Sequence, residues 1–162
     1  MDSLTLVIFG ITSNLAQIKL IPALYDMAEK GLLPQDMTII GTARGQKSRQ
    51  EFINYFHQVL HLENKHHQHA IKDSVLQDLL SRLHYVNGNL DDLDFYQQLK
   101  DTLYRLKSKN RIFYLATYPE LYHYAFEHLK KSGLSSEDAG WVRLMIEKPI
   151  GSDLRSAQEL NQ

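Results

Sequence analysis

Five short apolar segments, separated by longer amphipathic ones, constrain the fold of this 162-residue chain more than any other feature. An apolar run without alternation is typical of a strand that is buried on both faces of a parallel sheet. Strand and helix patterns alternate, which predicts a doubly wound (Rossmann-type) α/β fold with helices on both faces of a mainly parallel sheet. We expect residues 1–162 to form one domain. The strand patterns occupy 4–9, 38–41, 85–89, 111–116 and 142–147, and the helix patterns 14–30, 52–62, 75–83, 93–107 and 121–131.

Pro22 lies inside the first helical segment. Proline has no backbone N–H and its ring clashes with the preceding turn, so we expect this helix to kink or break there. A further helix is expected to begin at Ser152 and to continue to the last residue, Gln162.

Composition excludes several classes of protein. The 18 Lys and Arg residues nearly balance the 19 Asp and Glu residues, so the chain lacks the basic excess of a nucleic-acid groove. No stretch approaches the ~20 apolar residues of a membrane span, and the first residues do not resemble a targeting signal. We therefore expect a soluble, cytoplasmic protein with no nucleic-acid or membrane partner. The absence of cysteine excludes disulfides and thiolate metal sites.

Eight histidines suggest a metal site as one interpretation. His57 and His61 are one helical turn apart, and Lys65-His-His-Gln-His69 adds three more. A zinc site needs three or four converging ligands, yet the sequence has no H-E-x-x-H pattern and no cysteine. The pattern favours solvated polar side chains, and we predict no metal.

The segment Gly10–Ala16 joins the first apolar run to the first helical segment. In a doubly wound sheet the ligand lies beyond the carboxyl ends of the strands, where a phosphate can meet free N–H groups at a helix N-terminus. Gly10 permits a tight turn, and the small side chains of Thr12 and Ser13 allow close approach of a pyrophosphate. A single glycine followed by Thr, Ser and Asn would serve equally well as a plain helix N-cap, so both interpretations stay open.

The second apolar run ends in Gly41-Thr-Ala-Arg44. An NAD-binding sheet usually places an acidic residue at this point for the ribose 2′-hydroxyl, whereas an arginine suits the 2′-phosphate of NADP. A solvated loop arginine is the alternative. Taken together with the first loop, Arg44 favours NADP.

Lys148 follows the fifth apolar run in the sequence Glu147-Lys-Pro149. It falls at the carboxyl end of the predicted strand, on the side where the ligand is expected. Lysine is seldom buried without a partner, so Lys148 could bind a phosphate or polarise a sugar hydroxyl, although a structural role is equally open.

Several short motifs occur in one order along the chain, and together they resemble a known family. They are Val7-Ile-Phe-Gly10, Leu15-Ala16, Lys19-Leu20, Pro22-Ala-Leu24, Thr42-Ala-Arg44, Phe113-Tyr-Leu-Ala116 with Pro119, and Glu147-Lys-Pro149 with Gly151 and Asp153-Leu154. Over essentially its whole length the chain resembles the amino-terminal coenzyme domain of glucose-6-phosphate dehydrogenase. The resemblance implies an oxidoreductase that uses NADP to oxidise glucose 6-phosphate to 6-phosphogluconolactone, the first step of the pentose phosphate pathway.

The resemblance also implies a role for individual residues. It places Lys148 against both the coenzyme and glucose 6-phosphate, and Lys19 near the substrate. The implied coenzyme contacts are Gly10, Ile11, Thr12, Ser13, Asn14 and Leu15 at the diphosphate, Arg44 at the 2′-phosphate, Leu90 and Asp91 beside the adenosine, and Ala116, Tyr118, Pro119 and Tyr122 around the nicotinamide.

Some positions depart from the family pattern. Its loop usually reads G-A-S/T-G-D-L-A, but here Ser13 replaces the second glycine and Asn14 the aspartate. If Ser13 must adopt a conformation that favours glycine, the loop is strained by ~1–3 kcal/mol. Tyr118 stands where the family has the first of two prolines.

The histidine–aspartate motif that removes the hydroxyl proton lies, in the family, beyond the last residue of this chain. We therefore expect a fragment that is inactive alone and that belongs to a homo-oligomer when full length. The alternative is a non-catalytic dinucleotide-binding or regulatory protein on the same fold.

Overall fold

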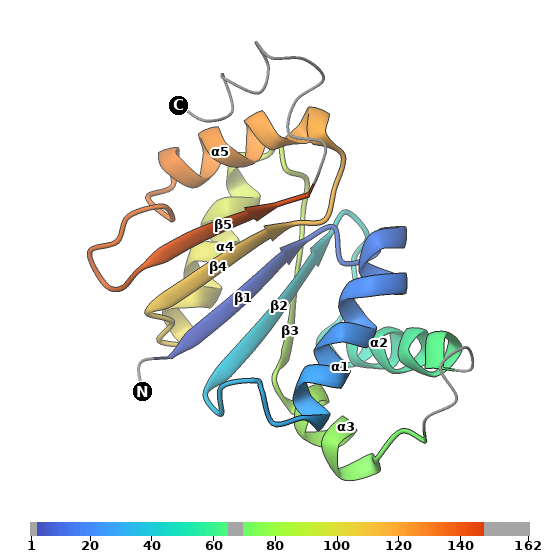
Figure 1. Ribbon diagram of the computed structural model, residues 1–162. Coiled ribbons are helices and arrows are strands. Elements are labelled where there is room, and N and C mark those ends of the chain that lie inside the picture. Colours follow the sequence, from blue (N-terminus) through green and yellow to red (C-terminus); the bar gives the residue numbers. More distant parts are fainter. Residues whose placement is uncertain (1–2, 65–69, 148–162) are drawn as a thin grey trace.

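Five parallel strands form the single sheet of the computed structural model, which describes residues 3–64 and 70–147. The strands are β1 (Leu4–Phe9), β2 (Met37–Ala43), β3 (Leu83–Asn87), β4 (Asn110–Leu115) and β5 (Val142–Ile146). Their order is β3-β2-β1-β4-β5, and each neighbouring pair is parallel (Figure 1). The predicted doubly wound α/β fold is therefore confirmed.

Helices cover both faces of the sheet, as predicted (Figure 1). Each face has its own apolar core, because residues alternate in direction along a strand. Ile8 of β1 faces one core, while Val7 and Phe9 face the other. The first core packs against η1 (Ala16–Leu20), α1 (Ile21–Glu29), α2 (Arg49–Asn64) and α3 (Asp73–Ser81), and the second against α4 (Leu93–Arg105) and α5 (Tyr122–Lys131), which the short η2 (Pro119–Leu121) precedes.

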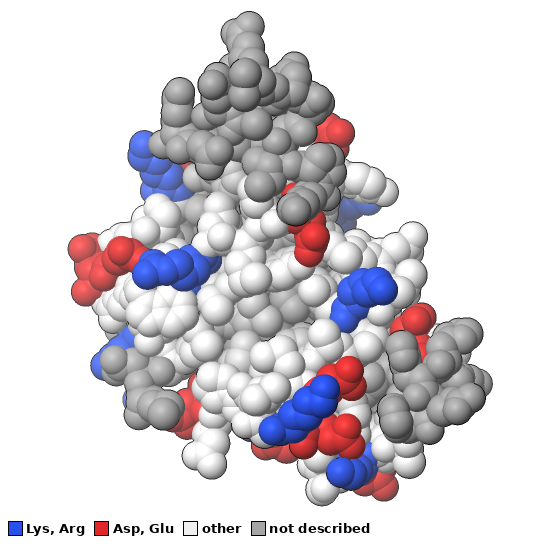
Figure 2. All heavy atoms as spheres, in the orientation of Figure 1, with Lys and Arg blue, Asp and Glu red and all other residues white. Residues whose placement is uncertain are grey.

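The described surface carries charges of both signs. In the view of Figure 2, Lys and Arg side chains are interspersed with Asp and Glu around an uncharged area over the strands. Within the described residues, no helix combines the length and the apolar content that are needed to cross a bilayer.

The first helix changes type just before Pro22. Its opening segment, η1, is π-helical, and the N–H of Ile21 donates to the carbonyl of Ala16 five residues earlier. Pro22 follows in the first turn of α1 and supplies no N–H to the carbonyls of the π-helical turn before it. The expected break does not occur, because Leu20 and Ile21 keep helical dihedral angles; the winding instead switches from π- to α-helical immediately before Pro22.

Several element boundaries differ from the prediction by two or three residues, and the shift of one strand changes where two site residues lie. The strand expected at 85–89 is β3, which begins and ends two residues earlier, at Leu83 and Asn87. Leu83 continues the helical spacing of the preceding segment, yet it is fully buried in the sheet beside Ile39 of β2. Consequently Leu90 and Asp91 lie in the loop after the strand and do not end it.

Helix α2 begins at Arg49, three residues before the predicted start. Ser48 and Glu51 form a capping box: Glu51 N–H donates to Ser48 Oγ at 3.2 Å, and Ser48 N–H donates to Glu51 Oε2 at 2.7 Å. The bond from the Ser48 backbone N–H, with a smaller contribution from the Ser48 side chain, holds the pKa of the Glu51 carboxyl below its usual value. The Ser-x-x-Glu signal is present in the sequence, but it was outweighed by the apolar spacing, which starts only at Phe52.

Phe52 of α2 closes the first core over the middle of β2. Its ring lies so close to Gly41 that a Cβ at that position would meet the Phe52 Cζ at 2.4 Å. The Phe52 ring also contacts Tyr85 of β3 at 5.1 Å between centroids and is fully buried. The Phe52 ring therefore occupies the space that a side chain at position 41 would need.

Replacing Phe52 with alanine should lower the free energy of unfolding by ~3–5 kcal/mol, because a large cavity would form where the sheet offers only a glycine. Urea denaturation measures the change. Tyr104→Ala is the matched control, since Tyr104 is 84% exposed and its loss should change stability by no more than about 0.5 kcal/mol. Equal losses in both variants would contradict this account of the core.

Candidate functional site

The loops that follow the strands meet at one edge of the sheet, because all the strands are parallel. The chain passes from β1 to β2 on one side, whereas β4 lies on the other side of β1, so the strand order reverses between β1 and β4. This switch point is where doubly wound folds bind ligands. The residues that immediately follow its two strands are Gly10 and Ala116, both of which were predicted as site residues.

Gly10 and Ala116 are in direct contact at the switch point. The N–H of Ala116 donates to the carbonyl of Phe9 at 2.9 Å. A Cβ on Gly10 would lie 2.6 Å from the Ala116 carbonyl oxygen, and Gly10 has a φ of +83°. Both the conformation and the space therefore require glycine.

The loop after β1 is anchored on β2. The N–H groups of Gly10 and Ile11 both donate to the carbonyl of Thr42 at 3.0 Å, and Ile11 is fully buried. The N–H of Ser13 then donates to the carbonyl of Gly10 at 2.9 Å, which closes a tight turn. The turn leaves Thr12 exposed at the carboxyl edge of the sheet.

Ser13 caps the first helix and is not strained. Its Oγ accepts from the N–H of Ala16 at 3.2 Å, and Gln17 supports the turn by donating from Nε2 to the carbonyl of Thr12 at 2.9 Å. Among the described residues Lys107 is the one non-glycine residue with positive φ, so the hypothesis of a glycine-only conformation at Ser13 is wrong. The N-cap interpretation of this loop is confirmed, because serine suits the cap conformation.

Asn14, Leu15 and Lys19 follow the cap on the same helical segment. Asn14 is exposed in the first turn, and Leu15 is half-buried against the first core. Lys19 lies on η1 with its side chain in solvent.

Arg44 follows β2 directly and is exposed. Its loop is fixed by Tyr85, whose hydroxyl donates to the carbonyl of Gly45 and, at 3.3 Å, to that of Ala43. The N–H of Gly88 also donates to the Ala43 carbonyl, at 3.0 Å. The backbone on both sides of Arg44 is therefore held while its side chain stays accessible.

Lys47 is a candidate that the sequence analysis missed. Its Nζ lies 3.8 Å from the position that a Cβ would occupy on Gly45, and 5.8 Å from the centroid of the Tyr55 ring. The ammonium group thus folds back over the residue next to Arg44, held by a cation–π contact. The sequence signal that could have identified Lys47 is its position, three residues after Arg44.

Tyr55 links α2 to the first loop. Its hydroxyl donates to the carbonyl of Ile11 at 3.5 Å, and its ring stacks on Phe52. Burial, with a smaller contribution from Tyr85, raises the pKa of Tyr55 to about 12, so the phenol stays protonated at neutral pH. The same helix therefore contacts the loops after both β1 and β2.

Leu90 and Asp91 lie in the loop between β3 and α4. The carbonyl of Leu90 accepts from the hydroxyl of buried Tyr96 at 2.9 Å, which fixes this loop on the second core. Asp91 is exposed. Asp92 then caps α4 by accepting from the N–H of Asp94 at 2.9 Å.

The loop after β4 contains Ala116, Tyr118 and Pro119. Ala116 is buried beside Gly10, whereas the Tyr118 side chain is 77% exposed. Tyr118 has φ −67° and ψ 140°, which are values that proline adopts, so tyrosine fits the family's proline position without a change of backbone. Tyr122, at the start of α5, is buried.

Glu147 is held at the end of β5 by two tyrosines. The Tyr114 hydroxyl donates to its carboxylate, and the Tyr122 hydroxyl donates to its carbonyl at 3.5 Å. Burial and then the bond to Glu147 raise the pKa of the Tyr114 phenol. The next residue, Lys148, lies outside the described residues, so its predicted place in the site is not tested.

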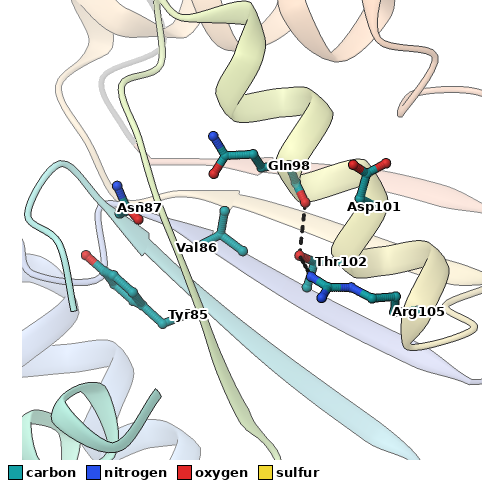
Figure 3. Close-up of a pocket in the computed structure, with 7 residues that line it drawn as sticks. All are labelled: Tyr85, Val86, Asn87, Gln98, Asp101, Thr102 and Arg105. Carbon is teal, nitrogen blue, oxygen red and sulfur yellow. Dashed lines mark hydrogen bonds between the residues drawn. The ribbon is translucent and has the colours of Figure 1, made fainter. Parts of the chain in front are cut away.

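A polar hollow of about 490 Å³ lies away from the switch point, between edge strand β3 and helix α4 (Figure 3). Arg105 donates to Thr102 Oγ1 at 3.0 Å, and Thr102 donates to the carbonyl of Gln98 at 2.9 Å. None of the residues predicted to bind coenzyme lines this hollow. It is therefore not the site that the loops form.

The comparisons with known proteins agree with this geometry. The family model described as "Glucose-6-phosphate dehydrogenase, NAD binding domain" matches residues 7–162. "Glucose-6-phosphate 1-dehydrogenase 2" of Mycobacterium tuberculosis is 37% identical over 97% of this chain, and the Bacillus subtilis glucose-6-phosphate 1-dehydrogenase is 32% identical over 97%. The chain spans about a third of the length of these relatives, 31% in each case.

Solved structures show the same likeness. A crystal structure of glucose-6-phosphate 1-dehydrogenase from Mycobacterium avium superposes with a TM-score of 0.83 at 30% identity, over 99% of this chain and 33% of that one. A glucose-6-phosphate dehydrogenase in complex with its substrate glucose-6-phosphate gives the same TM-score, 0.83, at 29% identity and the same coverage. The fold of this chain is thus shared with these enzymes.

Gly10→Ala should destabilise the protein by roughly 2–5 kcal/mol, because the new Cβ adds a clash with the Ala116 carbonyl to the cost of a positive φ. Gly31→Ala is the matched control, since Gly31 has a φ of +66° with nothing within 4 Å of its missing Cβ. That variant should lose only about 1–2 kcal/mol. Chemical denaturation compares the two, and equal losses would show that the β1–β4 contact is unimportant.

Ser13→Ala should lower the free energy of unfolding by about 1 kcal/mol through loss of the cap, whereas Ser13→Gly should cost only a few tenths. A strained Ser13 would give the opposite sign, with the glycine variant more stable than the original chain. Thermal and urea denaturation of both variants distinguish the two accounts.

Proposed function

This chain belongs to the glucose-6-phosphate dehydrogenase family, in the part that forms the NAD-binding domain, and on that premise we propose that it binds NADP. We propose that the full protein uses NADP to oxidise glucose 6-phosphate to 6-phosphogluconolactone. The observation that carries the proposal is the contact between Gly10 and Ala116, which joins the two loops at the switch point of the sheet.

The choice of NADP over NAD rests on two positive charges in the loop after β2. Arg44 is exposed on a backbone held by Tyr85 and Gly88, so its guanidinium can reach a ligand without the loop moving. Lys47 adds an ammonium group beside Gly45. The 2′-phosphate of NADP is an anion to which an arginine can donate two parallel hydrogen bonds. The 2′-hydroxyl of NAD carries no charge.

The diphosphate belongs, in this proposal, at the turn from Gly10 to Leu15. Exposed Thr12 and Asn14 border the N-terminus of the first helix, where the positive end of the helix dipole favours an anion. The Ser13 hydroxyl oxygen already accepts the hydrogen bond of the Ala16 N–H, so this N–H is not available to the diphosphate. We therefore propose that the side chains of Thr12 and Asn14 supply hydrogen bonds to the diphosphate.

The remaining contacts divide between the two ends of the coenzyme. Leu90 and Asp91 would border the adenosine, in a loop fixed by Tyr96. Bound NADP would supply the hydride acceptor, and its nicotinamide end would lie against Ala116, Tyr118, Pro119 and Tyr122.

Glucose 6-phosphate would be bound by two lysines. Lys19 is exposed on η1, directly after the first loop, and can present its ammonium group to a sugar phosphate. Lys148 follows Glu147, which two tyrosines hold at the carboxyl end of β5. We propose further that the full protein is a cytoplasmic homo-oligomer without nucleic-acid or membrane partners.

Arg44→Ala should weaken NADP binding by ~1.5–3 kcal/mol and leave NAD binding almost unchanged, because only NADP carries the 2′-phosphate. Lys47→Ala should weaken NADP binding by a smaller amount, since an ammonium makes a less specific contact than a guanidinium fork. Fluorescence or calorimetric titration of the 162-residue chain with each coenzyme measures both effects.

Arg143→Ala is the matched control for loss of an arginine. Arg143 is exposed near the start of β5, away from the carboxyl edge, and pairs with Glu137 at 2.8 Å. Its replacement should leave both affinities unchanged. Equal losses of NADP and NAD in Arg44→Ala would contradict the assignment of Arg44 to the 2′-phosphate.

A further inference from the structure

His57 and His61 form a close pair on α2 that the proposed coenzyme site does not use. Their Nε2 atoms lie 3.2 Å apart, and their ring centroids are separated by 4.3 Å. His61 is about 18 Å along the helix axis from Arg49, at the end of α2 that is remote from the Arg44 loop. The pair therefore requires a separate explanation.

The separation of the two nitrogens suits a single metal ion. Two imidazole nitrogens on one tetrahedral ion, each at ~2.0–2.1 Å from the metal, are about 3.3–3.4 Å apart, and on adjacent octahedral positions they are about 2.9 Å apart. The observed 3.2 Å lies between these values. Without an ion, one ring can donate its proton to the other across the same gap.

The pair borders a hollow at the surface, near the C-terminal end of α2. The two rings, Gln58 and Leu62 line a hollow of about 390 Å³ at the surface. His61 lies in the last turn of α2, where the carbonyl end of the helix dipole favours positive charge. A metal ion at this point would be reached directly from solvent.

We propose that His57 and His61 chelate one divalent transition-metal ion of the class that favours imidazole, namely Cu²⁺, Ni²⁺ or Zn²⁺. Over residues 3–64 and 70–147 the structure contains no group of three or more His, Cys, Asp and Glu side chains that could hold an ion. The site is therefore a two-ligand chelate whose remaining positions are taken by water or by a small ligand. It differs from a zinc site with three or four protein ligands, for which the sequence has neither an H-E-x-x-H pattern nor a cysteine.

Titration of the 162-residue chain with Cu²⁺ tests the proposal. Calorimetry should give one ion per chain, and the paramagnetic resonance spectrum should show two equatorial imidazole nitrogens. Cu²⁺ should bind more tightly than Ni²⁺ or Zn²⁺. Copper at about 100 times its dissociation constant should raise the melting temperature by ~5–10 °C.

His57→Ala and His61→Ala should each weaken Cu²⁺ binding at least about tenfold, because either change reduces the chelate to one ligand. His57→Gln provides a second variant that keeps a polar side chain, and its melting temperature without metal shows that the fold is intact. His123→Ala, which removes an exposed histidine of α5, should leave binding unchanged.

A triple alanine variant at positions 66, 67 and 69 separates this site from the histidines that follow α2 in the sequence. Cu²⁺ binding should survive in the triple variant. The proposal is overturned if the triple variant loses the ion, or if His57→Ala and His61→Ala both keep the original affinity. It is also overturned if the spectrum shows a single imidazole nitrogen.

Discussion

The close approach of β1 and β4 at their carboxyl ends is the constraint on which the rest of the candidate site depends. A hydrogen bond from Ala116 to Phe9 continues the pairing of the two strands past their last residues, and it leaves no room for a Cβ on Gly10. Because β2 and β4 lie on opposite sides of β1, the strand order reverses at this contact. Doubly wound folds bind their ligands at such a switch point.

Helix α2 connects the stability of the domain to its proposed coenzyme preference. Phe52 packs over Gly41 in the first core, and Tyr55 reaches from the next turn to the carbonyl of Ile11. Tyr55 also positions Lys47 through its ring. The helix whose apolar side chains pack in the first core therefore also positions Lys47, one of the two groups that we propose to bind the 2′-phosphate.

The sequence predicted the order of strands and helices because buried parallel strands and amphipathic helices have distinct apolar periods. It misplaced β3, since Leu83 fits the spacing of the helix before it and only pairing with β2 shows that it belongs to the sheet. It also missed the capping box at Ser48 and Glu51, although both residues were readable. Local signals decided the element types, whereas pairing between distant segments decided their limits.

The sequence by itself determined the fold class and the family, because these depend on periodicity and on short motifs. Only the tertiary structure decided that Ser13 is an unstrained helix cap and that Tyr118 takes a backbone suited to proline. It also decided that Lys47 lies beside the residue after Arg44. Such facts depend on dihedral angles and on through-space distances between chain segments, and a linear pattern of residue types contains neither.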